Sequence, residues 1–277
     1  MRIGAIIQAR SASTRLPGKV LKYLPFNSEV TVLGQVIRRL KKSKLLDEII
    51  VATSTDIIDE CIVDIALEEN TSIFRGSMSN VLERYYQAAE HYNLDIIVRI
   101  TSDCPCVDPI IVDDLIVKHL ESDSDYTSNT LVRTYPVGLD VEVFNFNALD
   151  KCMNYAVDDL DKEHVTRFIY NNPDLFKIKN IMAREECFNP DIRITLDTWD
   201  DYMLLSAVYD YLYEVDNFFS TVDIINLFKG KPWLQLINNK VLSKKVFDNF
   251  DDELVEALKY LELQEFNRIK KFLIDNL

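Results

Sequence analysis

The chain has 277 residues, of which 45 are acidic and 31 basic, so its formal net charge at pH 7 is −14. This excess of acid argues against a nucleic-acid-binding surface, which needs a basic face to neutralise phosphates. No apolar run is long enough to span a bilayer, and the N-terminus lacks the apolar core of a secretion signal. We therefore expect a cytoplasmic protein without nucleic-acid or membrane partners, in which any polyanionic ligand is held by local cations or a metal ion.

Apolar strand-like runs alternate with helical patterns through the first half of the chain. The predicted strands are 2–9, 48–54, 71–76 and 95–103, and the predicted helices are 30–43, 56–70, 80–93 and 108–122. This alternation predicts an α/β fold with a parallel sheet covered by helices on both faces. In such sheets ligands bind outside the carboxyl ends of the strands.

The rhythm changes after about residue 123. We expect extended structure with an insertion-like loop over 126–145, a helix over 161–172, strands near 175–182 and 191–197, and a helix over 199–215. Beyond Pro232 the chain carries two amphipathic helical segments. These patterns predict a main domain over 1–235 and a C-terminal helical appendage over 236–277, which we expect to contact another subunit or enzyme.

A loop rich in cations and hydroxyl groups follows the first predicted strand, in the stretch IQARSASTRLPGKVL (7–21). Its cations and hydroxyls are Arg10, Ser11, Ser13, Thr14, Arg15 and Lys19. The loop is not a P-loop, because no glycine precedes Gly18 in it and Val20 follows the lysine, and G-x-G-x-x-G is absent. The side chains suit a triphosphate, although a solvated surface loop has the same composition.

Two carboxylates stand at the ends of predicted strands. Asp103 ends the strand over 95–103, and Asp197 ends the strand over 191–197. Taken singly, each is better explained as a turn or helix-capping residue. Taken as a pair beside a cationic loop, they predict metal-assisted chemistry on a phosphate, because Mg²⁺ prefers few carboxylates together with phosphate and water oxygens.

Six segments of the chain carry a further signal, in the order IIQARSASTRLPGKVL, FRGSMSNVLERYYQAA, VRITSDCPCVDP, GLDVEVFN, DKEHVTRFIY and RITLDTWDDY. Together they resemble the cytidylyltransferases of the spore-coat polysaccharide synthesis protein F type, which are relatives of the CMP-sugar synthetases for 3-deoxy-manno-octulosonate and acylneuraminate. The resemblance covers about residues 2–235. It implies a nucleotide-diphospho-sugar transferase fold, a Rossmann-like three-layer sandwich. It also implies activation of an acidic sugar or similar small anionic acceptor with CTP, Mg²⁺ as cofactor, and a homodimer.

The resemblance also implies roles for individual residues. The catalytic set would be Arg10, Arg15, Lys19, Asp103 and Asp197, the last two holding Mg²⁺. The nucleotide would be bound by Gln8, Ala9, Arg10, Ser11, Ser13, Arg15, Lys19, Arg75, Gly76, Ser77, Asn80, Arg84, Ser102 and Asp103. The acceptor pocket would be formed by Asp140, Glu142, Glu163, His164 and Arg167. The chain departs from the family pattern at Ser102, where glycine is usual, and at Arg167, where proline is usual.

The expected reaction joins CTP to an acceptor oxygen and releases pyrophosphate. Two alternatives stay open. One is a transferase of the same fold that uses another nucleoside triphosphate or a phosphate or phosphonate acceptor. The other is a non-catalytic partner protein that keeps the fold as a scaffold. The identity of the acceptor does not follow from the sequence.

Overall fold

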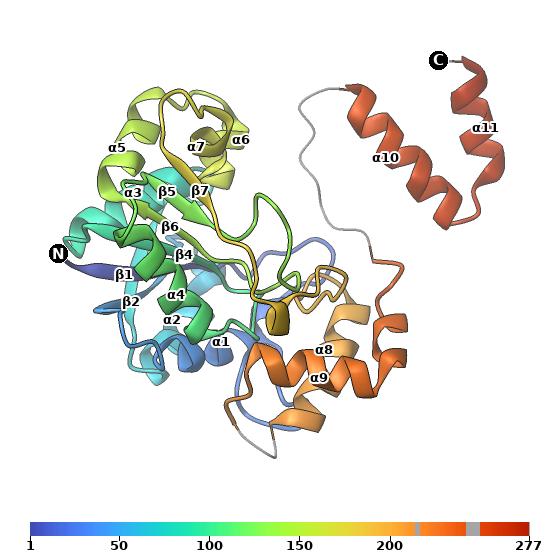
Figure 1. The fold of residues 1–277 in the computed structure, drawn as a ribbon, viewed down its shortest axis with the longest axis horizontal. Coiled ribbons are helices and arrows are strands. Elements are labelled where there is room, and N and C mark those ends of the chain that lie inside the picture. Colours follow the sequence, from blue (N-terminus) through green and yellow to red (C-terminus); the bar gives the residue numbers. More distant parts are fainter. Residues whose placement is uncertain (214–216, 242–249, 277) are drawn as a thin grey trace. The chain divides into compact units, whose positions relative to one another are not determined.

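The computed structural model describes residues 1–213, 217–241 and 250–276 (Figure 1). The chain divides into two compact units, Met1–Ile237 and Asn238–Leu277. The second unit contains the helices α10 (Phe250–Leu263) and α11 (Asn267–Asn276). No helix in the described ranges is both long and apolar enough to cross a membrane.

The first unit is built on a seven-stranded sheet with the strand order β3-β2-β1-β4-β6-β5-β7. Its strands are β1 (Ile3–Gln8), β2 (Glu48–Ser54), β3 (Ser72–Gly76), β4 (Ile96–Thr101), β5 (Tyr126–Ser128), β6 (Glu142–Asn145) and β7 (Ile178–Asn180). The pairs of β1 with β2 and β4, of β2 with β3, and of β5 with β7 are parallel. Only β6 runs against its neighbours β4 and β5. The predicted α/β class with a mainly parallel sheet is confirmed.

Helices cover both faces of this sheet (Figure 1). Side chains of α1 (Val32–Leu40), α2 (Glu60–Glu68), α4 (Pro109–Leu120), α8 (Trp199–Leu212) and α9 (Thr221–Gly230) form the larger apolar core. Side chains of α3 (Val81–His91), α5 (Phe146–Tyr155) and α7 (Arg167–Asn171) form the second. Successive side chains of β1 point to opposite faces of the sheet, so Ala5 and Ile7 pack in the first core and Ile6 packs in the second.

Two predicted elements differ from the structure. The helix expected over 161–172 is two short helices, α6 (Asp159–His164) and α7, because Val165 between them has a φ of 55° and ends the helical path. The strand expected over 191–197 makes only an isolated bridge between Val137 and Arg193, because its backbone bonds to loops rather than to a neighbouring strand.

Helices α5 and α9 were not predicted from the sequence. Helix α9 carried a usable signal, because Ser220 and Asp223 form a capping box at its start. Helix α5 follows β6 directly, and its cap residue Asn145 makes no capping hydrogen bond through its side chain.

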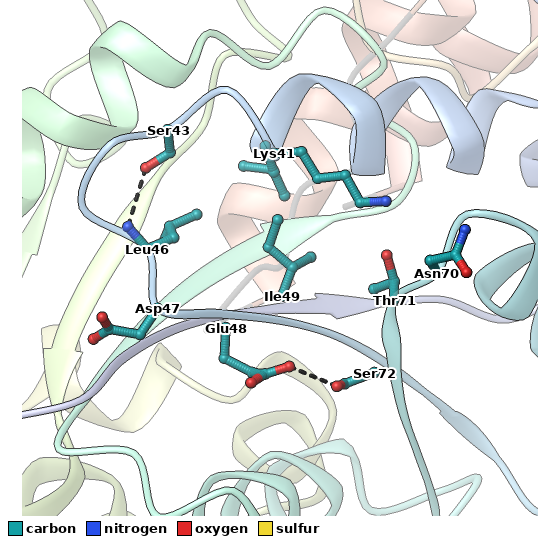
Figure 2. Close-up of a pocket in the computed structure, with 10 residues that line it drawn as sticks. Lys41, Ser43, Leu46, Asp47, Glu48, Ile49, Asn70, Thr71 and Ser72 are labelled. Atoms are coloured by element: carbon teal, nitrogen blue, oxygen red, sulfur yellow. Dashed lines mark hydrogen bonds between the residues drawn. The ribbon is translucent and has the colours of Figure 1, made fainter.

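A cavity of about 250 Å³ lies at the amino ends of β2 and β3, between Lys41, Glu48, Thr71 and their neighbours (Figure 2). Within it the Ser72 hydroxyl donates to Glu48 Oε1 at 2.5 Å. This edge of the sheet is opposite to the carboxyl ends of the parallel strands, and none of the residues predicted for the site lines the cavity. This cavity is therefore separate from the residues predicted for the site.

Candidate active site

The carboxyl ends of β1 and β4 bring together a cation and two carboxylates. Lys19 Nζ lies 2.6 Å from Asp103 Oδ2 and 2.9 Å from Asp197 Oδ1. Arg15 Nη2 adds a contact of 3.1 Å to the same Asp197 oxygen. Asp103 and Asp197, which are 84 and 178 positions from Lys19 in the sequence, thus both contact its ammonium group. We call Arg15, Lys19, Asp103 and Asp197 the charged centre.

The loop that carries Lys19 is closed by its own backbone. The Gly18 amide donates to the Ser11 carbonyl at 3.2 Å, and Gly18 has a φ of 64°, a conformation that glycine adopts without strain. Ser11 is fixed from outside by Asp59, whose Oδ1 accepts hydrogen bonds from the Ser11 amide at 2.7 Å and from its hydroxyl at 2.6 Å. Asp59, which sequence reasoning missed, therefore anchors the loop to the end of β2.

The segment before Asp197 is bonded to the backbone of Asp103. The Leu196 amide donates to the Asp103 carbonyl at 2.9 Å, and the Thr195 hydroxyl donates to the same oxygen at 3.2 Å. These two bonds tie the segment that leads to Asp197 directly to Asp103.

Asp197 is further held by Arg193 and Asp201, two residues that the sequence did not single out. Arg193 Nη2 lies 2.8 Å from Asp197 Oδ2, and its Nε lies 3.0 Å from Asp201 Oδ1. Asp201 is fully buried and accepts the backbone amides of Asp197 and Thr198 through Oδ2. The start of α8 was predicted, but only the folded chain places Arg193 between these two carboxylates.

The charges of this cluster reinforce each other. Burial by itself raises the pKa of Asp197, but Lys19, Arg15 and Arg193 outweigh it and lower that pKa to about 2. Burial by itself lowers the pKa of Lys19, but Asp103 and Asp197 outweigh it and leave that pKa above its usual value. Lys19 is therefore an ammonium and Asp197 a carboxylate throughout the neutral range.

Gly138→Ala is expected to disturb the path of the segment 192–197. Gly138 has a φ of +104°, and a Cβ atom there would lie 2.7 Å from the backbone of Ile194 and Thr195. Strain and overlap together should lower the free energy of unfolding by about 2–4 kcal/mol, measured by urea denaturation. The matched control is Gly230→Ala, since a Cβ at Gly230 meets nothing within 4 Å. Equal stabilities of the two variants would contradict the close approach.

The residues predicted near the nucleotide from β3 and α3 form a local network. Asn80 caps α3 by accepting the Glu83 amide, and the Ser77 hydroxyl accepts the Asn80 amide. Arg84 is buried beside Gly76 and donates through Nη1 to the Ser77 carbonyl at 2.9 Å, while its Nε has no partner. Burial lowers the pKa of Arg84 from its ordinary value.

The remaining predicted nucleotide residues differ in where they point. Arg75 turns to the end of β2, where it donates to the Ser54 and Asp56 carbonyls and pairs with Glu60 at 2.6 Å. Arg10 is more than half exposed and lies 4.0 Å from Glu163. Backbone hydrogen bonds hold Ala9 and Ser102 at the sheet edge. The Ala9 amide donates to the Ala52 carbonyl, and the Ser102 amide donates to the Gln8 carbonyl. Ser13 is half-buried in the loop.

Three of the predicted acceptor residues line one cavity of about 360 Å³, which also contains Arg99, Thr130, Leu131, Thr166 and Tyr170; the three are Asp140, Glu142 and His164. Because β6 runs against β4, its first residue Glu142 lies at the same edge as the carboxyl end of β4. Glu163 and Arg167 do not line this cavity. Arg167 instead pairs with Asp161 at 2.6 Å, with both side chains nearly buried.

Arg99, which the sequence analysis did not single out, links this cavity to the end of β1. Its Nη1 donates to Glu142 Oε1, and its Nη2 donates to Gln8 Oε1 at 3.1 Å. Glu142 Oε2 accepts the Tyr126 hydroxyl at 2.8 Å and the Thr166 hydroxyl. Burial alone lowers the pKa of Arg99, but the carboxylate of Glu142 reverses the effect and raises it. A bonded polar layer therefore joins β1, β4 and β6.

Arg99→Met is expected to lower the free energy of unfolding by about 3–5 kcal/mol, because it leaves the nearly buried Glu142 without its cation. Urea denaturation measures the effect. In the matched control, Arg2→Met, the lost pair is the more exposed one of Arg2 with Glu48, which should cost at most about 1 kcal/mol. Similar losses in both variants would show that the polar layer is not a stabilising element.

Comparison with known proteins gives one consistent family. A family model for cytidylyltransferases matches residues 4–218. An uncharacterised protein from Methanocaldococcus jannaschii is 38% identical over 249 residues, which are 88% of this chain and 97% of the relative. The spore coat polysaccharide biosynthesis protein SpsF of Bacillus subtilis is 35% identical over 232 residues, 82% of this chain and 94% of the relative. A 3-deoxy-manno-octulosonate cytidylyltransferase of Geobacter metallireducens is 32% identical over 131 residues, 47% of this chain and 49% of the relative.

Solved structures agree. A cytidylyltransferase from Leptospira borgpetersenii has a TM-score of 0.80 at 34% identity and covers 88% of this chain and 100% of its own. A CMP:2-keto-3-deoxy-manno-octonic acid synthetase complexed with CTP, at 14% identity and TM-score 0.57, shares the fold over 78% of this chain and 100% of its own. So does Rv0371c of Mycobacterium tuberculosis complexed with manganese, at 18% identity and TM-score 0.52, over 75% of this chain and 99% of its own. The chain therefore belongs to the cytidylyltransferase family and is a nucleotidyltransferase.

Proposed function

We propose that this enzyme couples CTP to an acidic sugar or a similar small anionic acceptor, giving a CMP-conjugate and pyrophosphate. The observation that carries the proposal is the charged centre, in which Lys19 lies within 2.9 Å of two carboxylates and Arg15 contacts one of them. Cations that can turn to phosphates, beside carboxylates that can hold a divalent ion, are the parts that nucleotidyl transfer needs.

The chemistry is an in-line displacement. The acceptor oxygen attacks the α-phosphorus of CTP, a new phosphorus–oxygen bond forms, and the bond from the α-phosphorus to the pyrophosphate oxygen breaks. Arg10, Arg15 and Lys19 neutralise the charge that grows on the leaving pyrophosphate. The hydrogen bonds from the Leu196 amide and the Thr195 hydroxyl to the Asp103 carbonyl hold both carboxylates near the reacting phosphate, so alignment is supplied by the fold.

The donor set fits Mg²⁺. Asp103 and Asp197 direct one oxygen each to a common positive charge, and Mg²⁺ takes one or two carboxylates together with phosphate and water oxygens. No cluster of three or more acidic, histidine or cysteine side chains that could hold a metal occurs in the described part of the chain. Bound there, Mg²⁺ supplies positive charge to the phosphate oxygens and lowers the pKa of the acceptor hydroxyl.

The acceptor is assigned to the cavity of Asp140, Glu142 and His164. The cavity lies at the same sheet edge as the charged centre, and Arg99 connects it to Gln8, the last residue of β1. An acidic sugar as the acceptor, and CTP as the nucleotide, are supported by the names of the octulosonate relative and of the synthetase complexed with CTP. We place the reaction in the cytoplasm.

Calorimetric titration with CTP, UTP, ATP and GTP in the presence of Mg²⁺ tests the nucleotide assignment without knowledge of the acceptor. We expect CTP to bind at least roughly tenfold more tightly than the other three, since each tenfold corresponds to about 1.4 kcal/mol of base recognition. Preference for another triphosphate would overturn the CTP assignment, and binding of none would favour a scaffold role.

A further inference from the structure

The two carboxylate oxygens of Asp197 have different partners. Lys19 and Arg15 of the charged centre both contact Oδ1, at 2.9 and 3.1 Å. Oδ2 instead lies 2.8 Å from Nη2 of Arg193, which is not part of the charged centre. Asp197 therefore offers one oxygen to the charged centre, while Arg193 holds the other.

Arg193 is fixed in this position by Asp201. Its Nε lies 3.0 Å from Asp201 Oδ1, and its Nη2 also donates to Asp201 Oδ2 at 3.2 Å. The Asp201 side chain is fully buried, and its Oδ2 accepts the amides of Asp197 and Thr198. If the guanidinium turned away, a buried carboxylate would lose its cation, which is strongly unfavourable. We therefore expect Arg193 to stay on Oδ2 when a ligand enters the site.

Asp103, the other carboxylate of the charged centre, is less restricted. Its Oδ2 pairs with Lys19 at 2.6 Å, but its Oδ1 lies 3.7 Å from the Cys104 sulfur, and a thiol is only a weak donor. A restraint on the number of carboxylate oxygens that an ion can use thus comes from Asp197 and Arg193.

The number of available oxygens matters for the choice of metal ion. Mg²⁺ demands near-ideal octahedral geometry and keeps several waters beside one or two carboxylates and phosphate oxygens. Ca²⁺ takes six to eight oxygens and often binds both oxygens of one carboxylate. With Oδ2 on Arg193, Asp197 can give either ion one oxygen, but it cannot give Ca²⁺ a second.

We propose that Arg193 determines the metal specificity of this enzyme: by holding Oδ2 it keeps Asp197 a one-oxygen ligand, and it thereby favours Mg²⁺ over Ca²⁺. The inference rests on the proposed function only in placing a divalent ion between Asp103 and Asp197. It depends on neither the nucleotide nor the acceptor. Arg193 acts through Asp197, so it is a positioning residue.

The test compares the binding of Ca²⁺ and Mn²⁺ to the full chain without nucleotide. Mn²⁺ stands in for Mg²⁺, because both take octahedral oxygen sites and Mn²⁺ is detected by electron paramagnetic resonance. All variants are made on Lys19→Met, in which the ammonium no longer occupies oxygens of Asp103 and Asp197. Titration gives the affinity for Mn²⁺, and displacement of bound Mn²⁺ gives the affinity for Ca²⁺.

The test variant adds Arg193→Met together with Asp201→Asn, so that no buried carboxylate is left without its cation. The matched control adds Arg15→Met, which removes a cation from Oδ1 of the same carboxylate. The test variant leaves the net charge unchanged, whereas the control makes it more negative. A general gain in cation binding would therefore be larger in the control, and only the ratio of the two affinities reports the oxygen that Arg193 holds.

We expect the affinity for Ca²⁺ relative to Mn²⁺ to rise at least roughly tenfold in the test variant and to stay within about twofold in the control. Circular dichroism checks that both keep their helix content. Arg193→Lys keeps the charge but loses the fork that reaches both carboxylates, so it should raise the ratio at least roughly threefold. This variant carries the test if the double replacement unfolds.

Asp103→Asn on the same background separates the two ways in which the account can fail. If it weakens Mn²⁺ binding but the ratio is unchanged in the folded Arg193 variants, the role of Arg193 is overturned and the proposed metal site stands. If Mn²⁺ does not bind, or binds equally well after Asp103→Asn, the metal site itself is overturned, and the role of Arg193 with it.

Discussion

Asp103→Asn is expected to lower pyrophosphate release from CTP by roughly 10²–10³-fold, or about 3–4 kcal/mol in the barrier. The substitution keeps the size of the side chain but removes the charge that Oδ2 offers to Lys19 at 2.6 Å. An amide oxygen is a weaker ligand for Mg²⁺ than a carboxylate, and the leaving pyrophosphate loses the ion that would neutralise it. The measurement is the initial rate of pyrophosphate release at saturating CTP, with the acceptor that supports release by the unmodified enzyme.

Asp200→Asn is the matched control for this change. Asp200 lies in the first turn of α8, close in sequence to Asp197, but its side chain is exposed. It should retain nearly the full rate. Equal rates for Asp103→Asn and the unmodified enzyme would remove Asp103 from the catalytic set.

Lys19→Met is expected to weaken CTP binding by roughly 10²-fold, because it removes the least exposed cation of the loop from a site that must hold a triphosphate. The same change should strengthen binding of Mn²⁺ in the absence of nucleotide, since Asp103 and Asp197 then lose the ammonium that competes for their oxygens. Calorimetry with CTP and electron paramagnetic resonance of bound Mn²⁺ measure the two effects, which have opposite signs.

Lys22→Met provides the control for Lys19→Met. The Lys22 ammonium lies 4.0 Å from the centre of the Trp199 ring, so the same loss of charge occurs three residues away without touching the two carboxylates. It should leave both affinities within about twofold of the unmodified enzyme. A Lys19→Met variant that binds CTP normally would show that Lys19 serves the fold and not the nucleotide.

Local patterns in the sequence were enough to predict the half of the sheet that starts the chain. Strands β1 to β4 and helices α1 to α4 fall within a few residues of the predicted ranges, because each is set by an apolar period and a cap, as at Asp108 before α4. The prediction of a strand over 191–197 was wrong. The backbone of this segment forms hydrogen bonds with Val137 and with the Asp103 carbonyl, and no local pattern in the sequence reveals these partners.

The same limit applies to the candidate site. Lys19, Asp103 and Asp197 were selectable, because each follows a strand-like run or lies in a conspicuous loop. Arg99 and Arg193 were not, since one looks like any polar residue within a strand and the other like a surface charge. Arg99 matters because it pairs with Glu142, which is 43 positions away in the chain. Arg193 matters because it pairs with Asp201, whose burial only the folded chain shows.

The most direct test of the central claim is pyrophosphate release from each of the four common nucleoside triphosphates with Mg²⁺. Each is combined with a panel of acidic sugars and of phosphorylated and phosphonate acceptors. We predict release with CTP and an acidic sugar, and little release when either is omitted. Faster release with another nucleoside triphosphate, or no release from CTP with any acceptor and no CTP binding by calorimetry, would contradict the account.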